Sequence, residues 1–294
     1  MTNAVSPALH KNSWWKNLRR FVKTPKGHIL AALILLSVIG SRFPSGHLGL
    51  SHAVAAAAAA LAFDALVAKA LGRKVLFSTG GLITGLIISD VLSGLVSIPS
   101  VILTTLIALA SKHLLKRGRK PLFNPAAVGL TISALVFSNA QNWWASMPLV
   151  PMWTLMVMLA VGIFVAVRVN KYLQVLTFLG SYFSLLIIMA SLHAGIASAT
   201  PSDALREPFL NAALFFGFFM LTDPPTTPAT IKQQLGFAVV VAFIAVAVFI
   251  KMGGLVYLFI GLMAGNLLTA GLARSRRAAK TKAPSKRMAG SQSS

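Results

Sequence analysis

Residues 235–250, LGFAVVVAFIAVAVFI, form an apolar run without a charged side chain, and this run decides the fold class. It lacks the alternation of apolar and polar positions that a strand of a membrane barrel shows. A helix satisfies its backbone hydrogen bonds within itself, which is why lipid tolerates a continuous apolar segment in that form. The run therefore predicts a membrane-spanning α-helix.

The composition of the whole chain agrees with this interpretation. Of its 294 residues, 56% are hydrophobic and 11% are charged, and Asp and Glu together number five. A soluble domain carries roughly 25% charged residues because its surface faces water. We therefore predict an all-α polytopic membrane protein whose surface contacts the lipid bilayer.

Similar apolar segments recur along the chain and predict about ten transmembrane helices within a membrane domain at residues 28–273. The predicted spans cover 28–42, 48–71, 75–92, 98–115, a segment beginning at 124–125, 152–169, 172–194, 209–222, 235–250 and 255–272. Several are shorter than the roughly 20 residues that cross a hydrocarbon core. Short spans interrupted by Gly or Pro often mark binding sites.

The basic residues predict the orientation of these spans. With the N-terminus inside, 24 of the 27 Lys and Arg residues fall in cytoplasmic segments, and only Arg42, Arg206 and Lys251 fall outside. This asymmetry is the positive-inside pattern, so the net charge of +22 indicates membrane topology and not a nucleic-acid partner. We expect a multi-pass protein of the bacterial inner membrane, with a basic cytoplasmic segment at 1–27 and a basic disordered cytoplasmic tail at 274–294.

The two halves of the chain end one span in a similar way. The third span ends in Ile-Ile-Ser-Asp at residues 87–90, and the eighth ends in Met-Leu-Thr-Asp at residues 220–223. Two halves of five spans each place these ends on opposite faces of the membrane. The sequence thus predicts two inverted five-helix repeats, an arrangement that forms a site at the pseudo-twofold axis.

The segment Thr222-Asp223-Pro224-Pro225-Thr226-Thr227-Pro228 follows the eighth span. Its prolines stop the helix and leave preceding carbonyl groups without intrahelical partners. Irregular backbone at membrane depth is tolerated where protein buries it or where it lines a cavity. The residues leave two interpretations open: a polar ligand site, or a turn that ends the helix at the cytoplasmic surface.

The segment Phe123-Asn124-Pro125-Ala126 predicts the start of a helix. Asn is a favoured N-cap, and Pro suits the first helical position. The free N–H groups of a helix N-terminus can also bind an anion or carbonyl oxygens. A capped transmembrane helix and a ligand-binding helix end both fit these residues.

Asp64, Asp90 and Asn266 place polar groups in or near the spans. Ionisable residues inside a membrane are candidates for function. Asp64 lies about one helical turn from Lys69, and we expect an ion pair between these two rather than a site.

Several segments resemble one known family. Lys112-His113-Leu114, Phe123-Asn124-Pro125-Ala126 and FFMLTDP at residues 218–224 occur in the order found in the RnfD/NqrB family, and Thr84-Gly85-Leu86 and Ala264-Gly265-Asn266 resemble two further family segments. The family comprises membrane subunits of Rnf-type and sodium-pumping NADH:quinone-type electron-transport complexes. The resemblance covers all ten predicted spans.

The resemblance implies ten helices in two inverted five-helix repeats and a flavin, FMN or riboflavin, held non-covalently within the bundle. It implies a cofactor-binding pocket formed by Thr84, Gly85, Asn124, Pro125, Thr222, Asp223 and Asn266. It gives no catalytic residue and no metal site. It also implies redox partner subunits, since one chain without cysteine cannot hold a complete electron relay.

One departure from the family concerns covalent flavin. Family members attach FMN to the last Thr of a D-G-x-S/T-x-A-T motif in an outer loop after the fifth span, and the corresponding loop here, 139–151, has no such Thr. Thr200 ends a similar segment after the seventh span, but Ala194 and Ala197 replace the Asp and the Ser/Thr of the motif. We do not expect covalent flavin at Thr200. In this respect the chain is similar to shortened relatives, including enediyne-biosynthesis (UnbU-type) membrane proteins.

The favoured hypothesis is an electron-transfer subunit, within an oxidoreductase or translocase complex, that passes electrons across the membrane through bound flavin. Two alternatives stay open. The chain could be a transporter or ion-conducting subunit that uses the same inverted-repeat cavity. It could also be a non-catalytic membrane anchor for a biosynthetic or redox complex.

Overall fold

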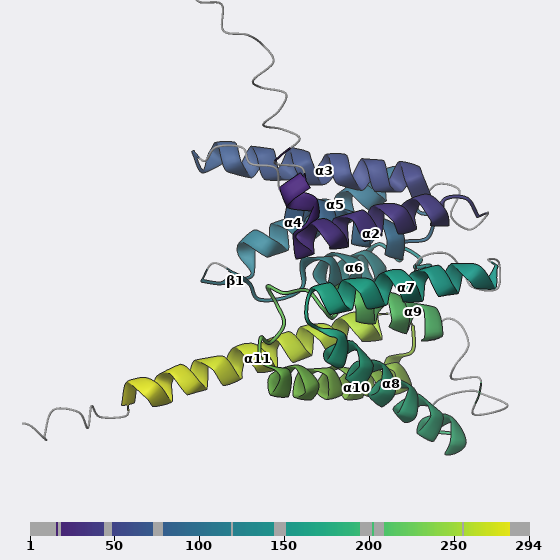
Figure 1. Cartoon of the computed structure of the whole chain (residues 1–294), viewed down its shortest axis with the longest axis vertical. Helices are drawn as coiled ribbons and strands as arrows, with labels where there is room; N and C mark the ends of the chain where they lie inside the picture. Colours follow the sequence, from purple (N-terminus) through teal and green to yellow (C-terminus); the bar gives the residue numbers. More distant parts are fainter. Residues whose placement is uncertain are drawn as a thin grey trace, which may run out of the picture.

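A computed structural model gives the fold (Figure 1). It describes residues 16, 19–43, 49–72, 79–118, 120–143, 151–194, 202, 209–254 and 256–282. Covalent attachment at Thr200 therefore concerns a residue outside the described part of the chain.

Ten helices dominate the described residues, and each falls on one of the predicted spans. The first five are α2 (Pro25–Gly40), α3 (Gly49–Ala70), α4 (Thr79–Val91), α5 (Ile98–Leu114) and α6 (Pro125–Val136). The second five are α7 (Met152–Arg168), α8 (Tyr172–Ser191), α9 (Phe209–Phe215) with its continuation η4 (Phe216–Met220), α10 (Ile231–Met252) and α11 (Tyr257–Lys282). A small antiparallel hairpin, β1 (Lys116–Arg117) and β2 (Lys120–Pro121), joins the two helices α5 and α6.

Four of these helices, α3, α8, α10 and the residues Tyr257–Ser275 of α11, are long and apolar enough to cross a membrane. The other six are apolar helices of 10–17 residues. Large apolar side chains also cover much of the outer surface, including Leu66 on α3 and Phe243 on α10, which are 68% and 62% exposed. Such a surface suits lipid, and the chain is an all-α membrane protein in its overall character.

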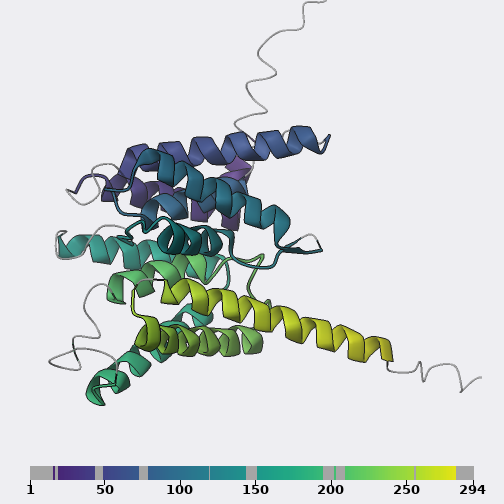
Figure 2. The same cartoon turned by 180° about the vertical axis from the view of Figure 1, so that it is seen from behind.

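The helices lie roughly side by side in a bundle (Figures 1 and 2). The helices α2 to α5 form one end of the row and α8, α10 and α11 the other, with α6, α7 and α9 between them. The two groups meet where α2 packs on α7 and where α6 packs on α11. At the first contact the start of α2 lies beside the end of α7, because Arg168 Nη2 is 3.5 Å from His28 Nε2.

The packing partners follow the same pattern in both groups. The helix α5 packs on α3 and α6, while α10 packs on α8 and α11. The helix α4 packs on α2, while α9 and η4 pack on α7. Several packing pairs of the first five helices thus recur among the second five, although α4 also packs on α5 and α6, contacts that α9 and η4 do not repeat to the same extent.

Two glycines make the same close contact in the two groups. A Cβ atom on Gly129 of α6 would lie 2.7 Å from Ala108 Cβ and 2.9 Å from Thr104 O. A Cβ atom on Gly261 of α11 would lie 3.0 Å from Ala245 Cβ and 2.9 Å from Val241 O. In both cases the partners are a carbonyl and an alanine one turn later, so the missing side chain lets two helix backbones approach closely.

The predicted disordered tail is wrong in its first part. The helix α11 continues to Lys282, so residues 274–282 are helical, while the remainder of the tail lies outside the described residues. This extension projects beyond the bundle on the side that carries the hairpin (Figure 1). Good helix formers in 273–282, chiefly Ala, Arg and Lys, explain why the helix does not stop at the end of the apolar run.

We predict that Gly129→Ala and Gly261→Ala each lower stability, by roughly 1–3 kcal/mol, because the added methyl overpacks a backbone contact. Gly180→Ala is the matched control, since a Cβ atom there meets nothing within 4 Å. It should leave stability unchanged or raise it by up to about 1 kcal/mol. The check is the midpoint of thermal unfolding in mild detergent, and equal shifts at all three positions would contradict the close contacts.

Candidate functional site

The break in the chain after η4 is the starting point of the site. The last turn of this helix is a π turn, in which Leu221 N–H donates to Phe216 O at 2.9 Å, and helical structure ends before Asp223. The prediction that the proline-rich segment stops the helix is therefore confirmed. Its carbonyl groups then need donors from elsewhere, because buried backbone oxygens are rarely left unpaired.

Side chains of three other helices supply those donors. Each donor is an amide or ammonium group that reaches one carbonyl of the break: Asn124 Nδ2 to Met220 O at 3.2 Å, Gln174 Nε2 to Leu221 O at 2.8 Å, Asn266 Nδ2 to Thr226 O at 3.0 Å, and Lys171 Nζ to Pro228 O. These contacts join α6, α8 and α11 to a segment far away in the sequence. The break is thus part of the bundle and not a loose surface turn.

Asn124 links three of these elements. Its Oδ1 accepts from Ala127 N–H at 3.2 Å, so the predicted N-cap with Pro125 in the first turn is confirmed. Its backbone N–H donates to Asn266 Oδ1 at 3.2 Å. Both asparagine side chains are buried and use both their oxygen and their nitrogen within the protein, which gives each of them a structural task.

A cavity of about 300 Å³ opens beside this junction. Thr84, Asn124, Pro125 and Asp223 of the predicted pocket line it. The rest of its wall includes the apolar side chains of Ile29, Ile83, Ile87 and Phe219 and the ammonium-bearing side chains of Lys26 and Lys112. The cavity is therefore mostly apolar with a charged rim.

The other three predicted pocket residues do not line this cavity. A Cβ atom on Gly85 would lie 2.9 Å from Ala56 O, so this glycine allows close packing of α4 on α3. Thr222 is buried and its Oγ1 donates to Phe218 O at 2.6 Å. Asn266 lies behind Asn124, where it bridges α6 and the proline-rich segment.

Asp223 is the acidic group of the cavity. Its Oδ2 accepts from Thr226 Oγ1 at 2.9 Å. Burial raises the pKa of Asp223 to about 6, against the opposing effects of this hydrogen bond and of the charges on Lys26, Lys112 and Lys171. Burial also lowers the pKa of Lys171 to about 8, and the charge of Asp223 opposes that shift. The carboxyl group therefore titrates closer to neutrality than a free aspartic acid does.

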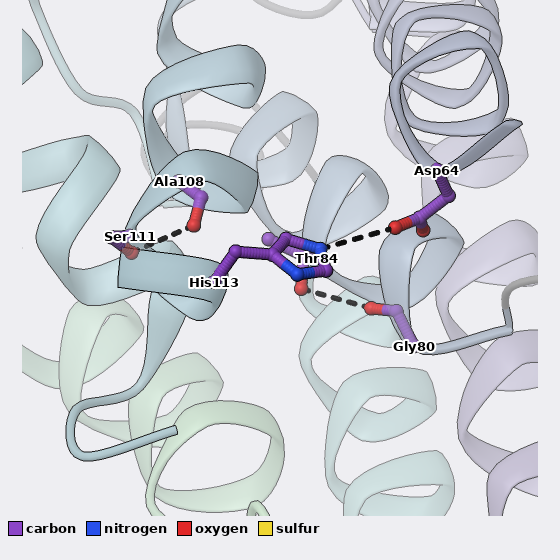
Figure 3. A network of polar contacts seen from close by, with 6 residues as sticks. All are labelled: Asp64, Gly80, Thr84, Ala108, Ser111 and His113. Atoms are coloured by element: carbon purple, nitrogen blue, oxygen red, sulfur yellow. Dashed lines mark hydrogen bonds and ion pairs between the residues drawn. The ribbon is translucent and has the colours of Figure 1, made fainter. Parts of the chain in front are cut away.

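A second polar cluster flanks the cavity wall (Figure 3). His113 Nε2 at the end of α5 lies 3.8 Å from Asp64 Oδ1 on α3, so the predicted pair of Asp64 with Lys69 is wrong. Figure 3 also shows Thr84 on α4, whose Oγ1 donates to Gly80 O at 2.9 Å. The histidine prevails as the partner because α5 packs on α3 and brings its ring to the carboxylate, a tertiary contact that helical spacing cannot predict.

A second cavity of about 320 Å³ lies between the hairpin and α11. Arg117 and Lys120 give it positive charge, and Arg117 Nη1 donates to Ala270 O at 2.7 Å. Pro121 and Pro225 line both this cavity and the first one. The mostly apolar cavity and the basic one therefore adjoin at these two prolines.

Sequence reasoning missed the residues that complete the site. Lys26 served only the prediction of topology, Lys112 belonged to a family-like segment but not to the predicted pocket, and Lys171 and Gln174 had no predicted contact. Gln174 did carry a signal, because an amide in an otherwise apolar helix needs a partner. Among the described residues, no group of three or more His, Cys, Asp or Glu side chains is placed to hold a metal ion.

Comparisons with known proteins add no family assignment: no protein-family model matches the chain, and no curated protein sequence matches it.

We predict that Asn266→Ala destabilises the fold by about 1–3 kcal/mol, because it leaves Thr226 O and Asn124 N–H without their partner. Thr269→Ala, one turn further along α11, is the control and should change stability by no more than about 0.5 kcal/mol. Thermal unfolding in detergent measures both. If Thr269→Ala lowered the unfolding midpoint as much as Asn266→Ala, the two hydrogen bonds of Asn266 would contribute no specific stability.

The raised pKa of Asp223 predicts a pH effect on stability. Between pH 3.8 and about 6 the folded state holds this proton more strongly than the unfolded state, so the contribution of Asp223 to stability falls as pH rises through this window. Above about pH 6 its contribution is constant. The difference in unfolding midpoint between the native chain and Asp223→Asn, measured from pH 4 to 7, should therefore change below pH 6 and then level off. A difference independent of pH would exclude the raised pKa.

Proposed function

We propose that this chain spans a bacterial inner membrane ten times, as two inverted five-helix repeats, and that it is an electron-transfer subunit with a non-covalently bound flavin. The repeated packing pattern and the paired contacts of Gly129 and Gly261 support the two repeats. Arg168 beside His28 supports the inversion, because it makes the counterpart helices α2 and α7 antiparallel.

The proposed orientation, with both termini in the cytoplasm, rests on the basic residues. Four basic residues lie at the ends of different helices, and Arg117 lies in β1, yet all five are at one end of the bundle around the two cavities; the four are Lys26, Lys112, Arg168 and Lys171. The extension of α11 projects from this same end (Figure 2). By the positive-inside rule this end faces the cytoplasm.

One observation carries the proposed electron-transfer role: segments that resemble the RnfD/NqrB family converge on one cavity. Thr84, Lys112, Asn124 and Asp223 belong to four of those segments, span some 140 positions of the chain, and line the same 300 Å³ space. Cavities of this kind, mostly apolar with a few convergent polar groups, are typical of cofactor sites.

The residues present fit a flavin. The flat apolar ring system suits the wall of Ile83, Ile87 and Phe219, and an anionic phosphate suits Lys26 and Lys112 at the rim. A bound flavin would supply one- or two-electron transfer, while the protein orients it and sets the charge around it. Redox partner subunits are part of the proposal because one cofactor does not form a complete path.

Ion conduction is the second candidate, and Asp90 favours it. This buried carboxylate near the end of α4 accepts from Ser37 Oγ at 2.7 Å on Oδ1, while Oδ2 has no hydrogen-bond partner within the described structure. A buried ionisable group in a span marks ion or proton pathways in many membrane proteins. The third hypothesis, a non-catalytic membrane anchor for a biosynthetic or redox complex, has no comparable observation in its favour.

We expect the protein, purified in mild detergent from flavin-replete cells, to show flavin absorption that acid precipitation releases into the supernatant. Lys112→Ala should lower flavin affinity about tenfold or more, as loss of a charge-assisted hydrogen bond does. Lys116→Ala is the control, since it removes the same charge from β1 outside the cavity lining. Titration of each apoprotein with FMN measures the affinity of the native protein and of the two lysine variants.

The outcomes separate the candidates. Intact protein without flavin, and without affinity for added FMN, would contradict the electron-transfer proposal and leave ion conduction to be tested in liposomes. Flavin that stays with the precipitated protein would indicate covalent attachment, including at Thr200. Equal loss of affinity in both lysine variants would indicate a general charge effect rather than a site in this cavity.

A further inference from the structure

A groove between α10 and α11 lies apart from the proposed flavin cavity and shares no lining residue with it. Its volume is about 650 Å³, larger than that of either cavity described above. Its lining combines residues from the first half of α10 and the middle of α11, with Pro228 at its end: Lys232, Gln233, Gly236, Phe237, Val240, Gly265, Leu268, Thr269, Leu272 and Ala273.

Two glycines give the groove its shape in different ways. At Gly265 the two helices are in tight contact, because a Cβ atom there would lie 2.6 Å from Val241 Cγ2 and 3.0 Å from Phe237 Cε2. At Gly236 a Cβ atom would meet nothing within 4 Å, so the missing side chain leaves open space on the surface. Gly265 thus allows close contact between α10 and α11, and Gly236 leaves the open space beside that contact.

The apolar part of the groove follows the direction of the helices. Lys232, Gly236 and Val240 are spaced four residues apart and so share one face of α10. Their separation corresponds to about 12 Å along the helix axis. On the other side, Leu268 and Leu272 of α11 remain 51% and 62% exposed along the same stretch. The groove thus runs along the helices and has apolar side chains on its α11 side.

One end of the groove is basic. Lys232 lies there, in the first turn of α10 and at the basic end of the bundle, together with the amide of Gln233. The N-cap Thr230 makes no side-chain hydrogen bond to the first turn, so the helix N-terminus adds its own free N–H groups. Arg274 follows directly after Ala273 on α11 and is exposed. This combination of charges and donors suits a phosphate.

We propose that this groove binds one anionic phospholipid, with an acyl chain along Gly236 and Val240 and the headgroup phosphate at Lys232. The positive charge at the end of the groove favours an anionic lipid over a neutral one, because basic pockets between helices on the cytoplasmic side bind anionic headgroups. The apolar length beside it fits the acyl chain of the same molecule. The proposal does not depend on flavin binding, so the two can fail separately.

The test is native mass spectrometry of the full chain in mild detergent, with phosphatidylglycerol and phosphatidylcholine of identical acyl chains added in turn. The native protein should retain phosphatidylglycerol better than phosphatidylcholine. Lys232→Gln should weaken retention of phosphatidylglycerol about fivefold and remove the preference, which corresponds to one basic residue near a headgroup. Gly236→Leu should reduce retention of both lipids, because its side chain begins in open space and fills the hollow.

Each variant has a matched control. Lys251→Gln removes the same charge from the opposite end of α10, and Gly180→Leu adds the same side chain at another glycine whose Cβ would meet open space, on α8. Both controls should retain phosphatidylglycerol as the native protein does. Size-exclusion chromatography identifies variants that fail to fold.

Three results would overturn the proposal. Equal retention of both lipids by the native protein would show that the basic end does not select a headgroup. Equal effects of a variant and its control would show that binding does not occur in the groove. A dimer in the native protein that Gly236→Leu converts to monomer would assign the groove to a second copy of the chain.

Discussion

A carbonyl oxygen inside a membrane protein must have a hydrogen-bond donor, and the break after η4 presents several carbonyls at once. An unsatisfied backbone group in an apolar environment costs several kcal/mol, a large fraction of the stability of a whole domain. Asn124, Gln174, Asn266 and Lys171 meet this demand from α6, α8 and α11. The break and these three helices are therefore fixed relative to each other, and the break together with the start of α6 forms one side of the cavity.

The same constraint explains which polar residues can serve a ligand. Asn124 and Asn266 use their amides within the protein, so they build the cavity and leave little for a bound molecule. Lys26, Lys112 and Asp223 are the residues with ionisable side chains that line the space itself. Framework and binding surface are thus separate sets of side chains, although they alternate along the chain.

Much of this fold could be predicted from local patterns. Apolar runs identified the ten helices, and Asn124 with Pro125 identified the start of α6, because capping depends on adjacent residues. Contacts between distant segments could not be predicted in this way. Nothing local distinguishes His113 from Lys69 as the partner of Asp64, and the phenylalanine-rich residues 216–220 give no sign that they form a π turn. The sequence analysis predicted disorder for the start of the tail because it is strongly basic. Ala, Arg and Lys nevertheless favour helix, and α11 continues through these residues.

Pro121 of the hairpin and Pro225 of the break belong to the walls of both cavities. Proline has no N–H group, so neither residue can donate a backbone hydrogen bond. Van der Waals contact is the interaction left to these rings, and each such contact is individually weak. Where the two cavities adjoin, the walls therefore contain residues that can move apart without breaking a backbone N–H hydrogen bond, so one ligand with an apolar body and an anionic end has room to occupy both.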